Sequence, residues 1–364
     1  MPRILDAYTG CAVYIYASIA DARNGEQIGG SGFLAHVPFE RNPDWCNGYV
    51  VTNWHVVQRA KTPVIRINRK DDTLEYIETE AEHWFRHPHG DDIAVLPVDI
   101  DLSTSGCFQA WSIPSEKFVT PKIVFDEDIG IGDDTVMIGR FISHEGKQKN
   151  SPAVRFGNIA MMAEERIITK DGLAQEAFLV EVRSLPGYSG SAVFIYSPCA
   201  INDMSQRRDG RKKGEHPPGE NPSKWTESEG RTTPSVADFG DLTWTTPKGP
   251  FLLGIDFCHI HRKSHVLTPD GKIVEDKLYI EENTGMAGVI PAWKIMEVLN
   301  LEELVAMREK EDHAITKRKN KSGASLDYAE EPSQTQTTAK GETISIPETD
   351  QFFDDLKKAS RRKD

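Results

Sequence analysis

The sequence predicts an all-β protein with two six-stranded antiparallel β-barrels and a C-terminal helix. Short apolar runs rich in Val, Ile and Tyr recur along the chain, which is typical of strands separated by turns. These runs fall into two sets of six. Because no helical pattern alternates with them, as it would in an α/β sheet, two packed barrels are the expected architecture.

The first set lies in residues 1–100, which we expect to form the first barrel. Only the segment 55–60, HVVQRA, has the pattern of a short helical turn. A polar stretch, 101–117, follows as a linker. The expected strands, in chain order, are CAVYIYASI, IGGSGFLAHV, GYVVTN, PVIRIN, LEYIETEAEHW and DIAVLPV.

The second set lies in residues 118–300 and predicts the second barrel. A closing helix is expected over 291–300, because a proline occupies its first turn and Trp293, Met296 and Leu299 share one helical face. The expected strands are DDTVMIGRFIS, AVRFGNIAMM, EAFLVEV, SAVFIY, PFLLGIDFC and GMAGVI.

Two polar stretches fall outside these strands. The insertion 197–249 combines Pro, Gly, Ser and charges of both signs, so we expect disorder there. It is either a regulatory or substrate-recruiting flap that overhangs the cleft between the barrels or a solvated spacer. Residues 301–364 predict a helix over 301–313, then a disordered charged tail. The amphipathic end of this tail, 351–360, either docks on a regulatory protein partner or frays.

Composition limits the classes of partner and compartment. The net charge of −13 argues against a surface that collects nucleic acid. Five scattered cysteines without C-x-x-C spacing predict free thiols in a reducing compartment. The apolar stretch 11–20 resembles a signal-peptide core, but Asp6 stands where positive charge is expected. We therefore expect a cytoplasmic protein with neither a nucleic-acid nor a membrane partner.

Residues 184–194, SLPGYSGSAVF, form either an ordinary tight turn or a turn that holds a nucleophilic serine. By itself, the pattern of Pro and Gly favours the ordinary turn. Two other motifs have equally plain interpretations alone. His55 in VVTNWHVV could be a buried core histidine, and Asp92 in HPHGDDIAVLPVD could begin a strand.

Together, the three motifs favour catalysis. His55, Asp92 and Ser189 follow one another in the chain order of the two-barrel serine proteases, with His and Asp in the first strand set and Ser in the second. Over residues 8–299 the sequence resembles the trypsin-like (chymotrypsin-fold) serine peptidases, nearest the bacterial HtrA/Deg-type protease domain. The segments that carry the resemblance are GGSGFLAH, VVTNWHVV, DDIAVLPVD, IGDDTVMIGRF, VRFGNIA, PGYSGSAVF, FLLGIDF and GMAGVIPAWKIMEVL.

The resemblance implies a serine endopeptidase that acts on protein or peptide substrates through an acyl-enzyme, with no cofactor and no metal. Ser189 would be the nucleophile, His55 its base and Asp92 the residue that orients the base. Asp92 is preferred to Asp91 because it abuts IAVL. The backbone N–H groups of Gly187 and Ser189 would form the oxyanion hole.

The sequence also departs from the family. In the secreted trypsin branch an aspartate precedes the nucleophile and pairs with a newly cut N-terminus. Tyr188 cannot form that ion pair, so activation by N-terminal cleavage is not expected. Ser191 replaces the usual second glycine. Residues 300–364 are too short and too polar for the PDZ domain that commonly follows an HtrA protease domain.

Specificity residues come from the resemblance alone. Arg183 and His259 would lie near the substrate pocket. Arg183 could select acidic side chains or form a surface salt bridge. His259 could line the pocket, belong to the core, or join His261 and His265 in a weak metal site, of which the pocket or core position is preferred.

Two other functions remain open from the sequence. The chain could be a non-catalytic, protease-like adaptor, or a protease that stays latent until a partner orders its nucleophile loop. An intact set of His55, Asp92 and Ser189 weighs against the adaptor, since an adaptor does not need all three. Composition does not separate an active protease from a latent one.

Overall fold

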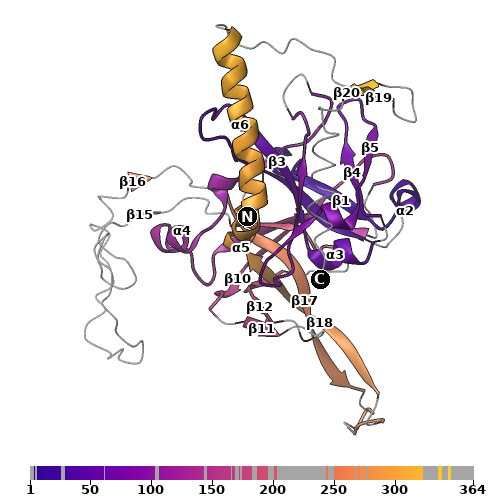
Figure 1. The fold of residues 1–364 in the computed structure, drawn as a ribbon. Coiled ribbons are helices and arrows are strands. Elements are labelled where there is room, and N and C mark those ends of the chain that lie inside the picture. The colour runs from indigo at the N-terminus through magenta and orange to yellow at the C-terminus, as the bar shows by residue number, and fades with distance from the viewer. Residues whose placement is uncertain are drawn as a thin grey trace.

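The structure of the chain is a computed structural model that contains two β units joined through a shared core (Figure 1). The described residues are 4, 6–25, 29–60, 62–102, 106–142, 146–164, 166–168, 172, 174–182, 187–195, 201–202, 243–244, 250–266, 268–270, 272–275, 278–322, 335–337 and 343–345.

The first unit is one eight-stranded sheet. Its strands run in the order β5-β4-β1-β2-β3-β7-β6, and β8 pairs in parallel with β2. Their bounds are β1 Ala12–Tyr16, β2 Gly29–Pro38, β3 Cys46–Thr52, β4 Val64–Asn68, β5 Leu74–Glu78, β6 Phe85–Arg86, β7 Ala94–Val98 and β8 Ile113–Pro114.

The structure does not show the closed six-stranded barrel predicted here: the six expected strands form, but the sheet has eight strands, with β5 and β6 at opposite ends of its order. The run expected to be one strand, LEYIETEAEHW, ends as β5 at Glu78. The chain then turns through the 3₁₀ helix η1 (Ala81–His83). The buried Trp84 Nε1 donates to Thr79 Oγ1 at 3.0 Å, which fixes this corner. The linker 101–117 also contributes β8 to the sheet.

The second unit is the closed six-stranded barrel that the sequence predicts. Its strands follow the order β10-β13-β18-β17-β14-β9 around the barrel. Alternating strand residues such as Val180, Val193 and Val289 fill its interior. The bounds are β9 Asp134–Gly139, β10 Ala153–Met161, β13 Phe178–Glu181, β14 Ala192–Ile195, β17 Phe251–His265 and β18 Tyr279–Pro291.

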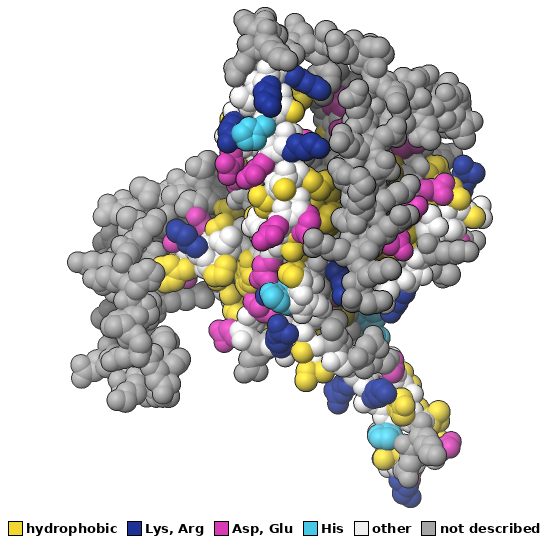
Figure 2. Space-filling view, viewed as in Figure 1, with side chains coloured by type: hydrophobic (Ala, Val, Ile, Leu, Met, Phe, Trp, Pro, Cys, Tyr) yellow, Lys and Arg dark blue, Asp and Glu magenta, His cyan; other side chains and the backbone are white. Residues whose placement is uncertain are grey.

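Strands β17 and β18 continue well beyond the barrel as a two-stranded hairpin (Figure 1). The sequence predicted only the barrel portions of both strands. Hydrophobic side chains lie among charged ones toward the far end of this hairpin (Figure 2). The hydrophobic side chains of this hairpin that are 43% to 55% exposed are Ile273, Val274, Leu278, Tyr279 and Ile280.

Three further strand pairs are short: β11 (Arg166–Ile168) with β12 (Ala174–Glu176), β15 (Ile201–Asn202) with β16 (Thr243–Trp244), and β19 (Thr335–Thr337) with β20 (Thr343–Ser345). Apart from β15 and β16, the insertion 197–249 lies outside the described residues, as does 351–360. The predicted roles of both segments therefore stay predictions.

Helices complete the fold, and the expected closing helix is confirmed as α5. Its buried residues are Ala292, Ile295, Val298 and Leu299, so Trp293 and Met296 flank the buried face instead of forming it. The helices are α1 Asp6–Thr9, α2 Ile19–Asn24, α3 Trp54–Gln58, α4 Pro121–Asp126, α5 Ala292–Leu299, α6 Glu302–Ser322 and the 3₁₀ helix η2 Ser115–Lys117.

Helix α6 is longer than the predicted 301–313, and charged side chains of both signs lie along it (Figure 2). Contacts to the β2–β3 hairpin support this length. Asn42 Nδ2 donates to Thr316 Oγ1 at 2.9 Å, beyond the predicted end of the helix, and Arg308 Nη1 donates to Tyr49 Oη at 3.1 Å. None of the described helices is both long enough and apolar enough to cross a bilayer.

The two units share one hydrophobic core. Phe33 and Val51 of the first sheet belong to the same buried cluster as Ile138 and Phe194 of the barrel, and Ile295 of α5 joins them. Burial of this cluster fixes how the units dock. The ends of β3 and β7 are thereby held against the barrel.

Candidate active site

His55 lies on the short helix α3, directly after the buried strand β3. Asn53 occupies the N-cap position, and the buried side chains of Val56 and Val57 anchor the helix in the core of the first unit. These anchors leave the His55 side chain 27% exposed. The imidazole therefore sits at the surface of a fixed element, as an accessible base requires.

Asp92 holds His55 at two points. Its Oδ2 lies 2.5 Å from His55 Nδ1, and its Oδ1 accepts the His55 backbone N–H at 2.8 Å. Since the carboxylate can only accept, Nδ1 carries the ring proton. Nε2 is then left with a free lone pair. This is the tautomer and orientation that a general base needs.

Asp92 is itself fixed by two distant segments. Its carbonyl oxygen accepts from Asn53 Nδ2 at 2.8 Å, and its N–H donates to Gln175 Oε1 of β12 at 2.9 Å. The preceding residue, Asp91, directs its carboxylate elsewhere, to within 3.3 Å of His87 Nδ1 and 3.6 Å of Lys294 Nζ. Asp92 and not Asp91 therefore contacts His55.

The turn that carries Ser189 is tied to both units. The Ser189 carbonyl oxygen accepts the Ser31 N–H of β2 at 2.7 Å, and the Gly190 N–H donates to the Asp256 carbonyl oxygen of β17 at 2.8 Å. Gly187 and Gly190 have φ angles of 95° and 91°. These are left-handed values that glycine adopts without strain.

Close contacts bring this turn next to α3. A Cβ on Gly30 would lie 2.7 Å from Val56 Cγ2 and 2.8 Å from the Ser189 carbonyl oxygen. The residue after His55 and the backbone of Ser189 thus pack on the same glycine. Thr52 Oγ1 also donates to the Ser31 carbonyl oxygen at 2.7 Å. This bond connects the end of β3 to β2, whose Ser31 N–H binds the Ser189 carbonyl oxygen.

Tyr188 occupies the position at which the secreted trypsin branch has the aspartate that pairs with the N-terminus. Here the tyrosine has a different partner. Its side chain is fully buried, and its hydroxyl accepts from Arg155 Nε of β10 at 2.8 Å. The Arg155 guanidinium lies 4.9 Å from the centre of the Tyr188 ring. Burial raises the pKa of Tyr188, more than Arg155 lowers it, so the hydroxyl stays protonated at neutral pH.

Of the two predicted specificity residues, the structure describes only His259. Arg183 lies outside the described residues. His259 is half-buried on β17, and its ring centre lies 4.3 Å from that of His261. Across the described part of the chain, no group of three or more His, Cys, Asp or Glu side chains is arranged to hold a metal ion.

Cys258 lies beside the proposed triad and is not activated. Burial, together with the nearby charges of Asp256 and Asp92, raises the pKa of its thiol to about 12. A thiol with this pKa remains protonated at neutral pH and is a poor nucleophile.

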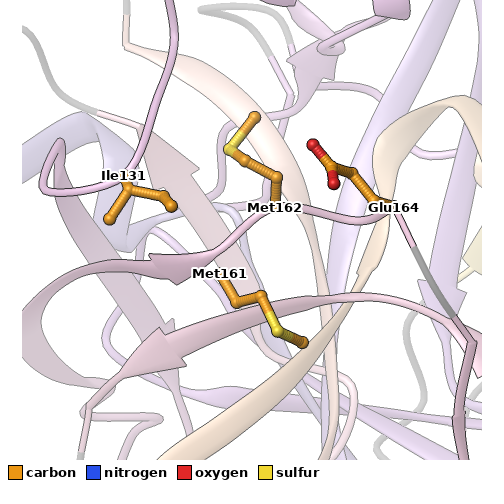
Figure 3. Close-up of a pocket in the computed structure, with 4 residues that line it drawn as sticks. All are labelled: Ile131, Met161, Met162 and Glu164. Atoms are coloured by element: carbon orange, nitrogen blue, oxygen red, sulfur yellow. The ribbon is translucent and has the colours of Figure 1, made fainter. Parts of the chain in front are cut away.

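A shallow pocket of about 170 Å³ lies away from these groups. It is lined by Ile131, Met161, Met162 and Glu164, and none of the three proposed triad residues borders it. Figure 3 shows the Met162 side chain between those of Ile131 and Glu164. The pocket adds nothing to the site.

The sequence motifs missed several residues that position the triad. Gln175 holds the Asp92 backbone from 83 residues away, and Ser31 and Thr52 connect the serine turn to β3. No local pattern marks these residues, because each acts across two segments that meet only in the folded chain. The acidic pair Asp91–Asp92 was the one visible signal that a second carboxylate lies behind the site.

Residues 30–197 match the family model of the trypsin-like peptidase domain. No curated protein matches the chain. Solved structures that resemble it include the protease domain of MamO from Magnetospirillum magneticum, with 12% identity over 82% of this chain and 100% of that one and a TM-score of 0.42. Two others are Deg5, with 16% identity over 52% and 80% and a TM-score of 0.34, and the HtrA-type protease AlgW with a tripeptide, with 13% identity over 80% and 60% and a TM-score of 0.36.

Every one of these TM-scores is below 0.5, so the structural likenesses support no conclusion about function. The sequence match carries more weight, since it spans the histidine, aspartate and serine motifs together. A domain of this family supports a protease function. Residues 30–197 are therefore similar to a trypsin-like peptidase domain, the family that the motifs resemble.

Proposed function

We propose that this chain is a serine endopeptidase that hydrolyses peptide bonds with Ser189, His55 and Asp92. The observation that carries the proposal is the pair of hydrogen bonds from His55 Nδ1 and N–H to the Asp92 carboxylate, beside the turn that bears Ser189. A carboxylate that fixes one imidazole tautomer next to a serine is the arrangement that activates a hydroxyl.

The reaction has two halves. Ser189 Oγ attacks the scissile carbonyl carbon while His55 Nε2 takes the hydroxyl proton, and Asp92 stabilises the charge that develops on the ring. The oxyanion accepts hydrogen bonds from the N–H groups of Gly187 and Ser189. His55 then gives its proton to the leaving amine, and the same steps with water release the acid and free Ser189.

The test uses a fluorophosphonate probe, which labels activated serines, and mass spectrometry of the intact protein. We expect one label on the wild-type protein and none on Ser189→Ala. Ser191→Ala is the matched control, because Ser191 is two residues away, fully buried, and its Oγ has no hydrogen-bond partner among the described residues. It should label like the wild type.

Substrate turnover provides a second measurement. Removal of the nucleophile from a serine protease lowers kcat by about 10⁶-fold, so Ser189→Ala should leave no measurable cleavage of a casein substrate. A folded wild-type protein that neither labels nor cleaves contradicts the proposal as stated. Addition of cell lysate then separates the two remaining functions: labelling that appears identifies a latent protease, and its continued absence favours the adaptor.

A further inference from the structure

A cluster of five charged or titratable side chains lies behind the Asp92 turn. His87 and Asp91 belong to the turn between β6 and β7, Glu176 belongs to β12, and Lys294 and Glu297 belong to α5. We call these five residues the Lys294 cluster. The proposed chemistry assigns none of them a role, and three separate elements meet in it.

Lys294 is the centre of this cluster. Its Nζ lies 3.0 Å from Glu297 Oε1, 3.4 Å from Glu176 Oε2 and 3.6 Å from Asp91 Oδ2. Its side chain is only 12% exposed. Burial lowers the pKa of Lys294, but the hydrogen bond to Glu297 and the charges of the three carboxylates outweigh burial and raise it. The ammonium group of Lys294 is therefore positively charged in the folded protein at neutral pH.

Asp91 depends on this charge. Its side chain is 1% exposed, and neither carboxylate oxygen accepts a hydrogen bond from the described residues. His87 does not supply one in its neutral form, because His87 Nδ1 accepts the Asp91 N–H at 3.3 Å while Nε2 faces Glu297 Oε2 at 2.8 Å. A buried carboxylate without hydrogen bonds is unfavourable unless a cation lies nearby. With His87 neutral, Lys294 is that cation.

Two of the three carboxylate partners of Lys294, Asp91 and Glu176, lead directly to Asp92. Asp91 precedes Asp92 in the chain, so a shift of the Asp91 carboxylate moves the Asp92 backbone. Glu176 follows Gln175, whose Oε1 accepts the Asp92 N–H. Glu176 is fixed further by Trp293 Nε1, which donates to its Oε1 at 3.0 Å. Lys294 thus bridges the two segments that hold Asp92.

We propose that Lys294 is a positioning residue for the peptidase reaction: it binds Asp91 and Glu176 together and so places the Asp92 carboxylate against His55. The inference rests on the proposed function of Asp92. Removal of the ammonium group leaves the buried Asp91 carboxylate without its cation, and the turn relaxes outward toward water. A displacement of about 1 Å in a catalytic group can lower a rate by about 10²-fold.

A purely structural role for Lys294 makes a different prediction. If Lys294 only docks α5 on the sheet, its loss lowers the melting temperature and leaves kcat unchanged for the molecules that stay folded. If Lys294 positions Asp92, kcat falls while KM changes little, because the interaction acts on the transition state and not on substrate binding.

The experiment compares Lys294→Met with Lys294→Arg, which keeps the charge. Lys122→Met is the matched control, because Lys122 forms an ion pair with Asp126 on α4 but is 82% exposed. We expect Lys294→Met to lower kcat by about 10- to 100-fold with KM within about twofold, and Lys294→Arg to recover most of this loss. Lys122→Met should behave as the wild type.

A second measurement does not require turnover. The proton in the short hydrogen bond between His55 Nδ1 and Asp92 gives a low-field ¹H NMR resonance, which can be recorded in a Ser189→Ala background. We expect Lys294→Met to shift or remove this resonance and Lys294→Arg to retain it. An inactive wild-type protein would overturn the proposed function, and this resonance would still decide the role of Lys294.

Two results would overturn the positioning role. One is a Lys294→Met protein with a lower melting temperature but an unchanged resonance and kcat. The other is an equal loss in Lys294→Arg, which would show that the charge is not what matters. If Lys294→Met does not fold, Glu176→Gln removes one of the two bridged carboxylates, and it should change the resonance in the same direction.

Discussion

Gly190, next to Ser189, is a residue at which the two units approach each other closely. Its φ is 91°, and a Cβ there would lie 1.9 Å from the Ser31 carbonyl oxygen and 2.6 Å from Thr52 Oγ1. The contacts that a side chain would break are those that hold the serine turn beside β2 and β3. This one position therefore links backbone conformation to the geometry of the proposed nucleophile.

We expect Gly190→Ala to abolish most activity while the fold persists. The clash with β2 should displace Ser189 and its N–H, and loss of an oxyanion donor alone lowers kcat by about 10²- to 10³-fold. Gly132→Ala is the matched control, since Gly132 has a φ of 94° but nothing lies within 4 Å of its Cβ position. The labelling rate with the fluorophosphonate probe measures the effect, and equal rates in both variants would contradict this account.

At the scale of elements, the strand pattern was predictable where burial alone determines it. All six barrel strands follow from their apolar runs, and α5 follows from its periodicity. The six runs of the first set also form strands, as β1, β2, β3, β4, β5 and β7. The early end of β5 was not predicted, because alternation in LEYIETEAEHW gives no sign that Trp84 returns to bind Thr79. The side chains of the outer parts of β17 and β18 are exposed or half-buried on both faces, so only the pairing of the two strands with each other makes them strands.

The candidate site also has residues that the sequence predicts and residues that it does not. Motifs in chain order located His55, Asp92 and Ser189, because each lies beside an apolar strand that the sequence makes visible. The supporting residues Gln175 and Lys294 were not predictable from any motif. They act through contacts between distant segments, and a single polar residue in a short element carries no periodic signal.

Helix α6 illustrates how such contacts extend an element. Asn42 is buried on the β2–β3 hairpin and donates to Asp312 Oδ1 and Thr316 Oγ1. We expect Asn42→Ala to lower the free energy of unfolding by about 1–2 kcal/mol, because two hydrogen bonds are lost at a buried site. Asn47→Ala removes an exposed hydrogen bond from the same hairpin to Glu311 and should change it by less than about 0.5 kcal/mol.

Chemical denaturation followed by circular dichroism measures both changes. Hydrogen exchange of the α6 amides then shows which part of the molecule has lost stability. Faster exchange after residue 308 in Asn42→Ala, with the barrel unchanged, is the expected result. A loss spread evenly over the molecule would mean that α6 does not depend on this anchor.

At the scale of the whole molecule, the proposed triad exists only where the two units meet. Ser31 of the first sheet shows this, because its N–H binds the Ser189 carbonyl oxygen while its Oγ donates to the Gly187 carbonyl oxygen at 2.8 Å. The same Oγ accepts the Arg140 N–H at 2.8 Å. Helix α5, at the end of the barrel, connects back to the first unit through Glu297 and His87.

This last connection predicts how acid weakens the docked state. Burial raises the pKa of Glu297, but hydrogen bonds from Lys294 and His87 and their charges outweigh burial and lower it below 4.5. The ionised carboxylate is therefore favoured by folding. Its contribution to stability is complete above pH 4.5 and is lost as the pH falls through the lowered pKa.

Glu297→Gln tests this contribution, because Gln keeps the shape of the side chain but does not titrate. We expect the wild type to melt at a higher temperature than Glu297→Gln at pH 7, and the difference to shrink as the pH falls from 5 toward 3. A difference that stays constant, or grows, in acid would mean that the carboxylate charge does not hold α5 to His87, and that packing of the apolar face of α5 alone joins the units.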